Sequence, residues 1–283
     1  MKVIDSHIHF SNRDGFKKTA REIGRLEYSA KSLQSEFARA RVVAAVVMGT
    51  SSRDDREYGY PEEFILPDGT LQHLFCCVGV NPEKLRQDDG ELRYIEQELC
   101  KDEVVGIKLY AGYFPYYVFD AVYEPVYALA RKYQVPVAIH CGDTQSPGGL
   151  LKYSHPLTID EMAVNYPDIN FIICHMGIPW MVDTAELISK NRNVYTDMSG
   201  LIAGDRKQIR SMKREKLYVN LIRQALVYAN RYDRVLYGSD WPLMPIGSYI
   251  DYIRHIVPKR HWEEVFYQNA LVVFPKMQSA LRI

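Results

Sequence analysis

The sequence lacks an excess of charge of either sign, because 35 Lys and Arg residues balance 35 Asp and Glu residues in a chain of 283. Proteins that bind nucleic acid through charge carry a basic surplus, so this class is disfavoured. No apolar run approaches the roughly 18 residues of a membrane span, and the N-terminus has no signal-peptide core. The five cysteines form no CxxC pair, which is typical of free thiols in a reducing compartment. We expect a cytoplasmic protein that contacts neither nucleic acid nor membrane.

Low-complexity segments and internal repeats are absent as well, and a regular series of short apolar runs stands out. Their centres are about 24 to 41 residues apart, and most steps have the length of one strand plus one helix. Apolar residues at intervals of three and four predict helices at 85–100, 120–133 and 217–230. Thr158 and Glu161 form a capping box that predicts a further helix start. The runs themselves predict strands at Val3–Asp5, Val42–Met48, Leu74–Val80, Val104–Leu109, Val135–His140, Asn170–His175, Val194–Met198 and Arg234–Gly238.

This alternation predicts an α/β fold, a (β/α)8 TIM barrel in a single domain over residues 1–283. Runs rich in Val, Ile and Leu favour parallel strands that are covered on both faces. A doubly wound open sheet is the alternative, but it would carry a Gly-rich phosphate loop after an early strand, and the sequence has none. Two long insertions, 51–72 and 200–216, follow the second and seventh strands. The second is rich in Lys and Arg and is either a solvated helix face or a lid that attracts an anionic substrate.

Histidine and aspartate gather where the strands end. His7 and His9 share one face of the first strand, and Asp5 lies on the same face one step deeper. His140 ends the fifth strand, His175 ends the sixth, and Asp240 follows the eighth, each next to a Gly-containing loop. This is the rim where barrel enzymes build their active sites.

Four imidazoles and a carboxylate at one rim predict a divalent metal site, and the alternative is a polar barrel mouth without an ion. No cysteine holds a ligand position, since alternation turns Cys174 away from the interior, so an open, catalytic site is favoured over a structural one. His73, His255 and His261 lie away from this rim and are interpreted as surface or packing residues. His155, in the long loop after the fifth strand, is left open between a structural and a functional role.

In these residues the chain resembles the amidohydrolase superfamily. Within it, the sequence looks like the branch of aminocarboxymuconate semialdehyde decarboxylase, resorcylate-type decarboxylases and several lactone hydrolases. The resemblance implies that His7, His9, His140 and Asp240 bind one divalent ion, with Zn expected and Mn as the alternative. It makes His175 a catalytic residue or a further ligand. The pieces that carry it are IDSHIH (4–9), GIKLY (106–110), VPVAIHCGD (135–143), HPLTIDEMAVNYPDINFIICHMG (155–177), VYTDMSG (194–200), LYGSDWP (236–242) and QNALVVF (268–274).

The main functional hypothesis is metal-assisted hydrolysis of a small carboxylate-bearing lactone, ester or amide. Asp240 would take a proton from water, His175 would polarise the water or the scissile carbonyl, and Asp5 would orient a ligand imidazole. Lys108 and Tyr110 are expected to contact the substrate, together with Trp241. Lys108 acts either on substrate charge or in a buried structural pair. Tyr110 stands where this branch often has His.

Two other functions stay open. Non-oxidative decarboxylation of an unsaturated or aromatic acid uses the same metal site, and a barrel that binds a ligand without catalysis is the third reading. Aromatic residues near the rim either line a pocket for a planar ring or pack against a second copy of the chain in a homo-oligomer. These are Tyr110, Tyr113, Phe114, Tyr116, Tyr117, Trp180 and Trp241.

Overall fold

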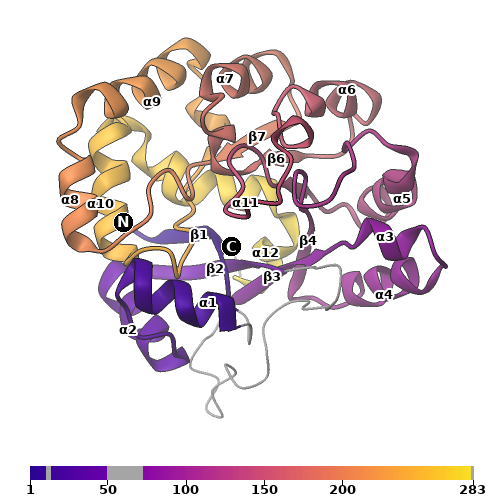
Figure 1. Cartoon of the computed structure of the whole chain (residues 1–283), viewed down its shortest axis with the longest axis horizontal. Helices are drawn as coiled ribbons and strands as arrows, with labels where there is room; N and C mark the ends of the chain where they lie inside the picture. Colours follow the sequence, from indigo (N-terminus) through magenta and orange to yellow (C-terminus); the bar gives the residue numbers. More distant parts are fainter. Residues whose placement is uncertain (11–13, 50–72, 282–283) are drawn as a thin grey trace.

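The computed structural model describes residues 1–10, 14–49 and 73–281, so the insertion at 51–72 lies outside the described residues. Eight parallel strands follow one another in sequence order around a barrel (Figure 1). Backbone hydrogen bonds join the last strand region to the first, with Ser6 N 2.9 Å from Tyr237 O and Asp240 N 2.8 Å from His7 O. The predicted (β/α)8 barrel is therefore confirmed. The strands are β1 (Val3–Ile8), β2 (Val42–Met48), β3 (Leu74–Gly79), β4 (Val104–Leu109), β5 (Val137–Ile139), β6 (Phe171–Ile173), β7 (Val194–Asp197) and β8 (Val235–Leu236).

Alternation along each strand divides the core into two layers. In β2, Val42 and Val47 pack outward against the helices, whereas Val46 and Met48 point into the barrel. Small inward residues such as Ala44 leave room for side chains from the opposite strands. Both faces are apolar because both are buried, which is why these runs are continuous in the sequence.

Helices surround the strands, and Figure 1 shows them as an outer ring. They are amphipathic and bury one face against the barrel. Within the described residues, no helix is long and apolar enough to cross a membrane. The helices are α1 (Asp14–Thr19), α2 (Ala30–Ala40), α3 (Pro82–Leu85), α4 (Gly90–Leu99), α5 (Glu124–Tyr133), α6 (Thr158–Asn165), α7 (Met181–Lys190), α8 (Arg206–Met212), α9 (Lys216–Ala229), α10 (Ile246–Ile256), α11 (Asn269–Val273) and α12 (Pro275–Ala280). Short 3-10 or π turns span Ala20–Gly24, Ala121–Tyr123, Leu151–Tyr153, Cys174–Gly177, Tyr232–Arg234, Lys259–His261 and Glu264–Gln268.

Two helix predictions were wrong in detail. The helix expected at 85–100 is interrupted between α3 and α4, where the Asp88 carboxylate accepts a hydrogen bond from Gly90 N at 2.5 Å and holds a turn. The helix start predicted at Thr158 is confirmed, since α6 begins there, but the expected capping box does not form, because Leu157 is the N-cap and the Thr158 hydroxyl donates to His155 O. A capping box forms instead at the start of α8, between Asp205 and Gln208.

The C-terminal helices close the N-terminal end of the barrel. Phe274 of the α11–α12 junction and Met277 of α12 join the interior cluster with Ile4 and Phe75. Lys276 Nζ donates to three carbonyls around the start of β4, those of Leu99, Lys101 and Val104, at 3.0, 2.7 and 2.8 Å. Figure 1 shows α11 and α12 across the centre of the strand ring. With this end covered, the opposite, C-terminal rim is the one that carries the loops.

Candidate metal centre and cavity

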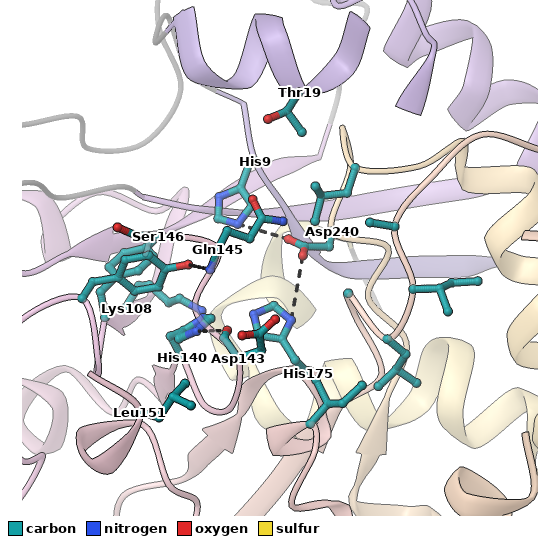
Figure 2. Close-up of a pocket in the computed structure, with 18 of the residues that line it drawn as sticks. His9, Thr19, Lys108, His140, Asp143, Gln145, Ser146, Leu151, His175 and Asp240 are labelled. Atoms are coloured by element: carbon teal, nitrogen blue, oxygen red, sulfur yellow. Dashed lines mark hydrogen bonds and ion pairs between the residues drawn. The ribbon is translucent and has the colours of Figure 1, made fainter. Parts of the chain in front are cut away.

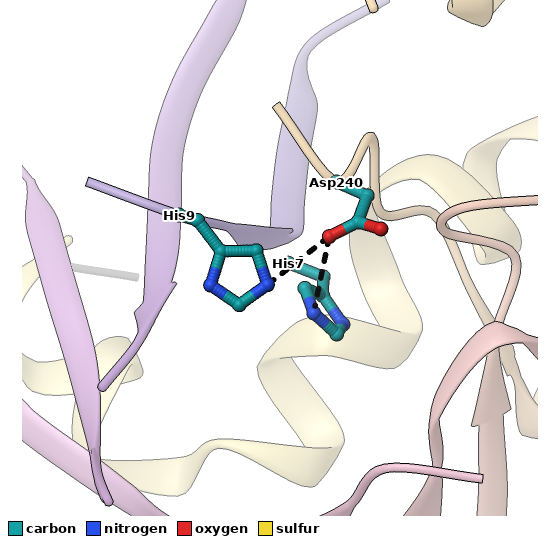
Figure 3. Close-up of side chains that lie close together, drawn as sticks. All are labelled: His7, His9 and Asp240. Carbon is teal, nitrogen blue, oxygen red and sulfur yellow. Dashed lines mark ion pairs between the residues drawn. The ribbon is translucent and has the colours of Figure 1, made fainter. Parts of the chain in front are cut away.

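His7, His9 and Asp240 meet at the C-terminal rim where the barrel closes (Figure 3). His9 Nε2 lies 3.2 Å from Asp240 Oδ1, and His7 Nε2 lies 3.6 Å from the same oxygen. One atom from each residue falls within 4.8 Å of the others. The loop after β8 and the end of β1 fix this arrangement, because Asp240 N donates to His7 O at 2.8 Å and His9 N donates to Trp241 O at 2.6 Å. Three of the predicted metal ligands therefore lie together.

Asp197, at the end of β7, forms a hydrogen bond with the Nδ1 side of the His7 ring, a role that was not predicted from the sequence. Its Oδ2 lies 2.8 Å from His7 Nδ1, and its Oδ1 accepts hydrogen bonds from His175 N at 2.9 Å and Ser199 N at 3.0 Å. A carboxylate can only accept here, so His7 carries its proton on Nδ1 and leaves the Nε2 lone pair directed at Asp240. The signal was in the sequence, since Asp197 ends an apolar strand as His140 does.

The His175 ring lies beside the same cluster because its backbone adopts an unusual conformation. Its φ is +61°, in the left-handed region, and this turn brings its ring beside that of His7, with the ring centroids 4.8 Å apart. His175 Nδ1 lies 3.2 Å from Ser199 O, 2.8 Å from Ser199 Oγ and 3.9 Å from Asp240 Oδ2. Since a carbonyl only accepts, Nδ1 carries the proton and His175 Nε2 is the basic nitrogen.

His140 ends β5 at the same rim but outside the three-residue group. Its Nε2 lies 3.0 Å from Asp143 O, and its ring centroid lies 5.0 Å from that of His175. Its assignment as a metal ligand stays a prediction.

Burial and neighbouring charge set the protonation states of the cluster. Burial lowers the pKa of His7 to about 3, so its ring is neutral at neutral pH. Burial alone would raise the pKa values of Asp197 and Asp240, but the surrounding imidazoles reverse this and lower both. Burial also lowers the pKa of His140 and that of His175. Neutral imidazoles beside ionised carboxylates are the forms in which these side chains bind a divalent cation.

The donor set fits such an ion. His7 Nε2 and Asp240 Oδ1 are buried and have no hydrogen-bond partner among the described residues. Unpaired buried polar atoms are rare in folded proteins and call for a partner. Gly200 faces the same point, since a Cβ added there would lie 2.7 Å from Asp240 Oδ2 and 2.8 Å from His175 Nδ1. Two imidazole nitrogens and one carboxylate oxygen suit Zn or Mn and leave coordination positions open.

The centre opens into a cavity of about 960 Å³ (Figure 2). Lys108 and Tyr110 line it, together with His9, His140, His175 and Asp240, and substrate binding by Lys108 and Tyr110 stays a prediction. Its other walls are mostly apolar or aromatic, formed by Phe16, Tyr113, Phe114, Leu151, Ile178, Pro179, Leu201, Ile202, Ala203 and Leu243. Of the insertion at 200–216, only the segment 200–203 lines the cavity, whereas Arg206, Lys207, Arg210 and Arg214 are exposed. This exposure favours a solvated helix face over a lid.

The structure corrects three side-chain placements. In the described part of the chain, Asp5 forms no hydrogen bond or ion pair with an imidazole. Its Oδ1 accepts from Ser239 N at 2.8 Å, and burial raises its pKa to about 7. Trp241 is fully buried, does not line the cavity and stacks on Tyr28 with ring centroids 4.9 Å apart. Cys174 points into the barrel, with Sγ 2.8 Å from Lys108 Nζ.

Other aromatic candidates also lie elsewhere. Tyr116, Tyr117 and Trp180 are not among the described residues that line the cavity. His155 packs against Trp180, with ring centroids 4.6 Å apart, and its Nδ1 accepts from Leu157 N. These contacts favour a structural role for His155.

Comparison with known proteins places this centre in a family context. The family model for amidohydrolases matches residues 4–276. A probable 2-pyrone-4,6-dicarboxylic acid hydrolase from Acinetobacter baumannii, with citric acid bound, is 17% identical at a TM-score of 0.63, over 97% of this chain and 100% of that one. A 2,6-dihydroxybenzoate decarboxylase from Rhizobium is 13% identical at 0.69, over 97% and 99%. A dihydroxybenzoic acid decarboxylase from Polaromonas, with bound manganese and 2-nitroresorcinol, is 14% identical at 0.64, over 97% of both chains. No curated protein matches significantly.

Proposed function

The chain belongs to the amidohydrolase family, and from that premise we propose that it is a metal-dependent hydrolase of a small carboxylate-bearing lactone, ester or amide. The observation that carries the proposal is the convergence of His7 Nε2, His9 Nε2 and Asp240 Oδ1 beside a cavity large enough for a small substrate. His7, His9 and Asp240 would hold a divalent ion, which would supply Lewis acidity and lower the pKa of a bound water molecule to about 7.

The protein's own residues divide the remaining work. Asp240 directs Oδ1 at the two ligand imidazoles, and its Oδ2 faces His175, so this second oxygen is placed to accept a proton from water and return it to the leaving group. His175 Nε2 is its basic nitrogen, and when protonated it can donate to a substrate oxygen. Asp197 positions His7 and His175 by accepting hydrogen bonds from His7 Nδ1 and His175 N. The mostly apolar walls lower the polarity around these groups, which strengthens their polar interactions.

Non-oxidative decarboxylation is the second candidate, and one observation favours it. Tyr110, Tyr113 and Phe114 place aromatic rings along the wall beyond β4, where a planar acid would stack. Tyr110 and Tyr113 themselves meet edge to face, with centroids 6.0 Å apart. In this reaction Asp240 or His175 would protonate the ring carbon that loses carbon dioxide. Similar solved structures include proteins named for either reaction.

A substrate screen on the Mn- and Zn-loaded protein distinguishes the reactions. Carboxylate-bearing lactones, esters and amides are tested beside aromatic and unsaturated acids. Proton release reports hydrolysis of a lactone or ester, the freed amine reports hydrolysis of an amide, and released carbon dioxide reports decarboxylation. We expect turnover of a lactone, ester or amide, and exclusive carbon dioxide release would favour the second candidate. Asp240→Asn is expected to lower turnover of either kind by at least about 10²-fold, the scale of general base catalysis. Wild-type turnover by a folded Asp240→Asn variant would contradict the role of Asp240.

Metal analysis tests the non-catalytic alternative. A bound divalent ion near one equivalent per chain after loading is expected for an enzyme of this design. Failure to retain Zn or Mn, with no turnover of any compound, would favour a barrel that only binds a ligand.

A further inference from the structure

Lys108 and Tyr110 stand side by side where β4 reaches the cavity. Lys108 is fully buried, and its Nζ lies 5.3 Å from the centroid of the Tyr110 ring. In the described part of the chain, its hydrogen-bond partner is Cys174 Sγ at 2.8 Å. A thiol is a weak acceptor, so the ammonium group retains donor capacity for a stronger one. Figure 2 shows Lys108 among the side chains that surround the pocket.

The Tyr110 hydroxyl also lacks an acceptor. Its oxygen is buried and has no hydrogen-bond partner among the described residues, although the ring borders the cavity. A buried hydroxyl without a partner destabilises the protein unless a ligand or water satisfies it. Lys108 and Tyr110 both line the cavity, so an ammonium group with spare donor capacity and a hydroxyl without a partner among the described residues belong to the same part of its wall. An oxyanion accepts from both.

Apart from the proposed metal centre, the described lining of the cavity offers no second cationic side chain for an anion. Among the lining residues that the structure describes, Lys108 is the only Lys or Arg, and the carboxylates of Asp143 and Asp240 are also present. Most of the remaining wall is apolar or aromatic, as at Phe114 and Ile202. An additional carboxylate on the substrate would lie unpaired against such a wall, which is strongly unfavourable.

We propose that Lys108 and Tyr110 together bind the one acid group of the substrate, and that this pair restricts the site to monoanionic acids with an apolar body. This inference rests on the proposed function, because an acid group bound by Lys108 and Tyr110, here called the anchor, must leave the reacting bond between these two residues and the metal ligands. Tyr110 is the specificity-determining partner, since its hydroxyl adds a directed donor to the charge of Lys108. A dicarboxylate of the same shape would be excluded by its second charge.

Binding of unreactive probes tests the anchor without requiring turnover. Benzoate, its neutral analogue benzamide and the dianion isophthalate are titrated calorimetrically into the full chain loaded with Mn. We expect benzoate to bind at least about tenfold more tightly than either of the other two, because a charge-assisted hydrogen bond contributes at least this factor. Benzoate no tighter than isophthalate, or no measurable benzoate binding, would overturn the proposal.

Two variants assign the effect to the anchor. Lys108→Met is expected to weaken benzoate at least about tenfold and benzamide little, and Tyr110→Phe to weaken benzoate about three- to tenfold. Tyr116→Phe is the matched control, because Tyr116 is not among the described residues that line the cavity and its hydroxyl accepts from Arg86.

Each remaining outcome is decisive. Unchanged benzoate affinity in folded Lys108→Met would show that the acid binds elsewhere, for example on the ion, and would overturn the proposal. Should Lys108→Met fail to fold, Tyr110→Phe and the three wild-type titrations decide alone. Selective benzoate binding by a protein that turns over nothing in the screen would refute the proposed function and leave the anchor intact.

Discussion

Replacing Asp197 by asparagine should separate metal binding from folding. The amide oxygen of the new side chain can keep the two hydrogen bonds from the backbone N–H groups of His175 and Ser199. Its NH₂ group then takes the place of Oδ2, 2.8 Å from His7 Nδ1. Two donors cannot face each other, so the imidazole proton must move to Nε2. That nitrogen faces Asp240 and can no longer bind a metal ion.

The geometry sets the size of the effect. Metal binding by the variant requires the other tautomer, in which Nδ1–H meets the amide NH₂ and loses a charge-assisted hydrogen bond of about 1.5–3 kcal/mol. This corresponds to a loss of roughly 10- to 150-fold in affinity, near the 10- to 100-fold typical of residues that support metal ligands. The metal-free protein keeps a hydrogen bond between the amide and His7, so we expect its free energy of unfolding to change by less than about 1 kcal/mol.

Competition with a metal-sensitive dye gives the Mn affinity, and urea unfolding of the metal-free protein gives its stability. Asp168→Asn is the matched control, because Asp168 pairs with Arg131 on the surface at 2.5 Å and should leave the affinity unchanged. Wild-type affinity in folded Asp197→Asn would refute the tautomer argument. An equal loss in the Asp168 control would show that the effect is not specific to the centre.

Three further predictions concern packing and charge. Gly200→Ala should reduce metal affinity and turnover, because its Cβ would lie 2.7 Å from an Asp240 oxygen at a backbone φ of +61°. Gly247→Ala in α10 is the control, since its Cβ would meet nothing within 4 Å, and it should raise the free energy of unfolding by roughly 0.5–1 kcal/mol. Equal metal affinity in the two variants would contradict the prediction. Lys276→Met should lower the free energy of unfolding in urea by about 2–3 kcal/mol because three carbonyls lose their donor, and an unchanged midpoint would exclude that role. Burial raises the pKa of Glu36, so ionisation of this side chain destabilises the folded state as the pH rises through that pKa. Glu36→Gln should therefore have a higher melting temperature than wild type at pH 7 and lose this advantage at pH 4. A higher melting temperature for wild type at pH 7 would contradict this explanation.

The architecture was predictable because each barrel strand is buried on both faces and leaves an apolar run of its own. The convergence of His7 with Asp240 was predictable for a related reason, since parallel strand ends gather at one rim. Asp197 also ends an apolar strand, so its place at this rim could be predicted, but its hydrogen bond with His7, 190 positions away, is visible only in the structure.

The wrongly predicted side-chain placements occur where the backbone departs from regular strand geometry. Cys174 and His175 both face the interior because His175 adopts a φ of +61°, which alternation does not anticipate. Register shifts within β1 separate Asp5 from the imidazoles that follow it. Trp241 follows Asp240 at a φ of +62°, and this turn sends the indole away from the cavity. Such turns depend on neighbouring strands, so local sequence patterns do not reveal them.

The position of α11 and α12 has a consequence for how the chain matures. Side chains from this last part of the sequence fill the base of the barrel, together with residues from β1 and β3. During ribosomal synthesis, strands made early must therefore wait for residues 269–280 before water can be expelled from that base. Chains cut short ahead of α11 would expose an apolar opening, the kind of surface on which nascent proteins aggregate or recruit chaperones.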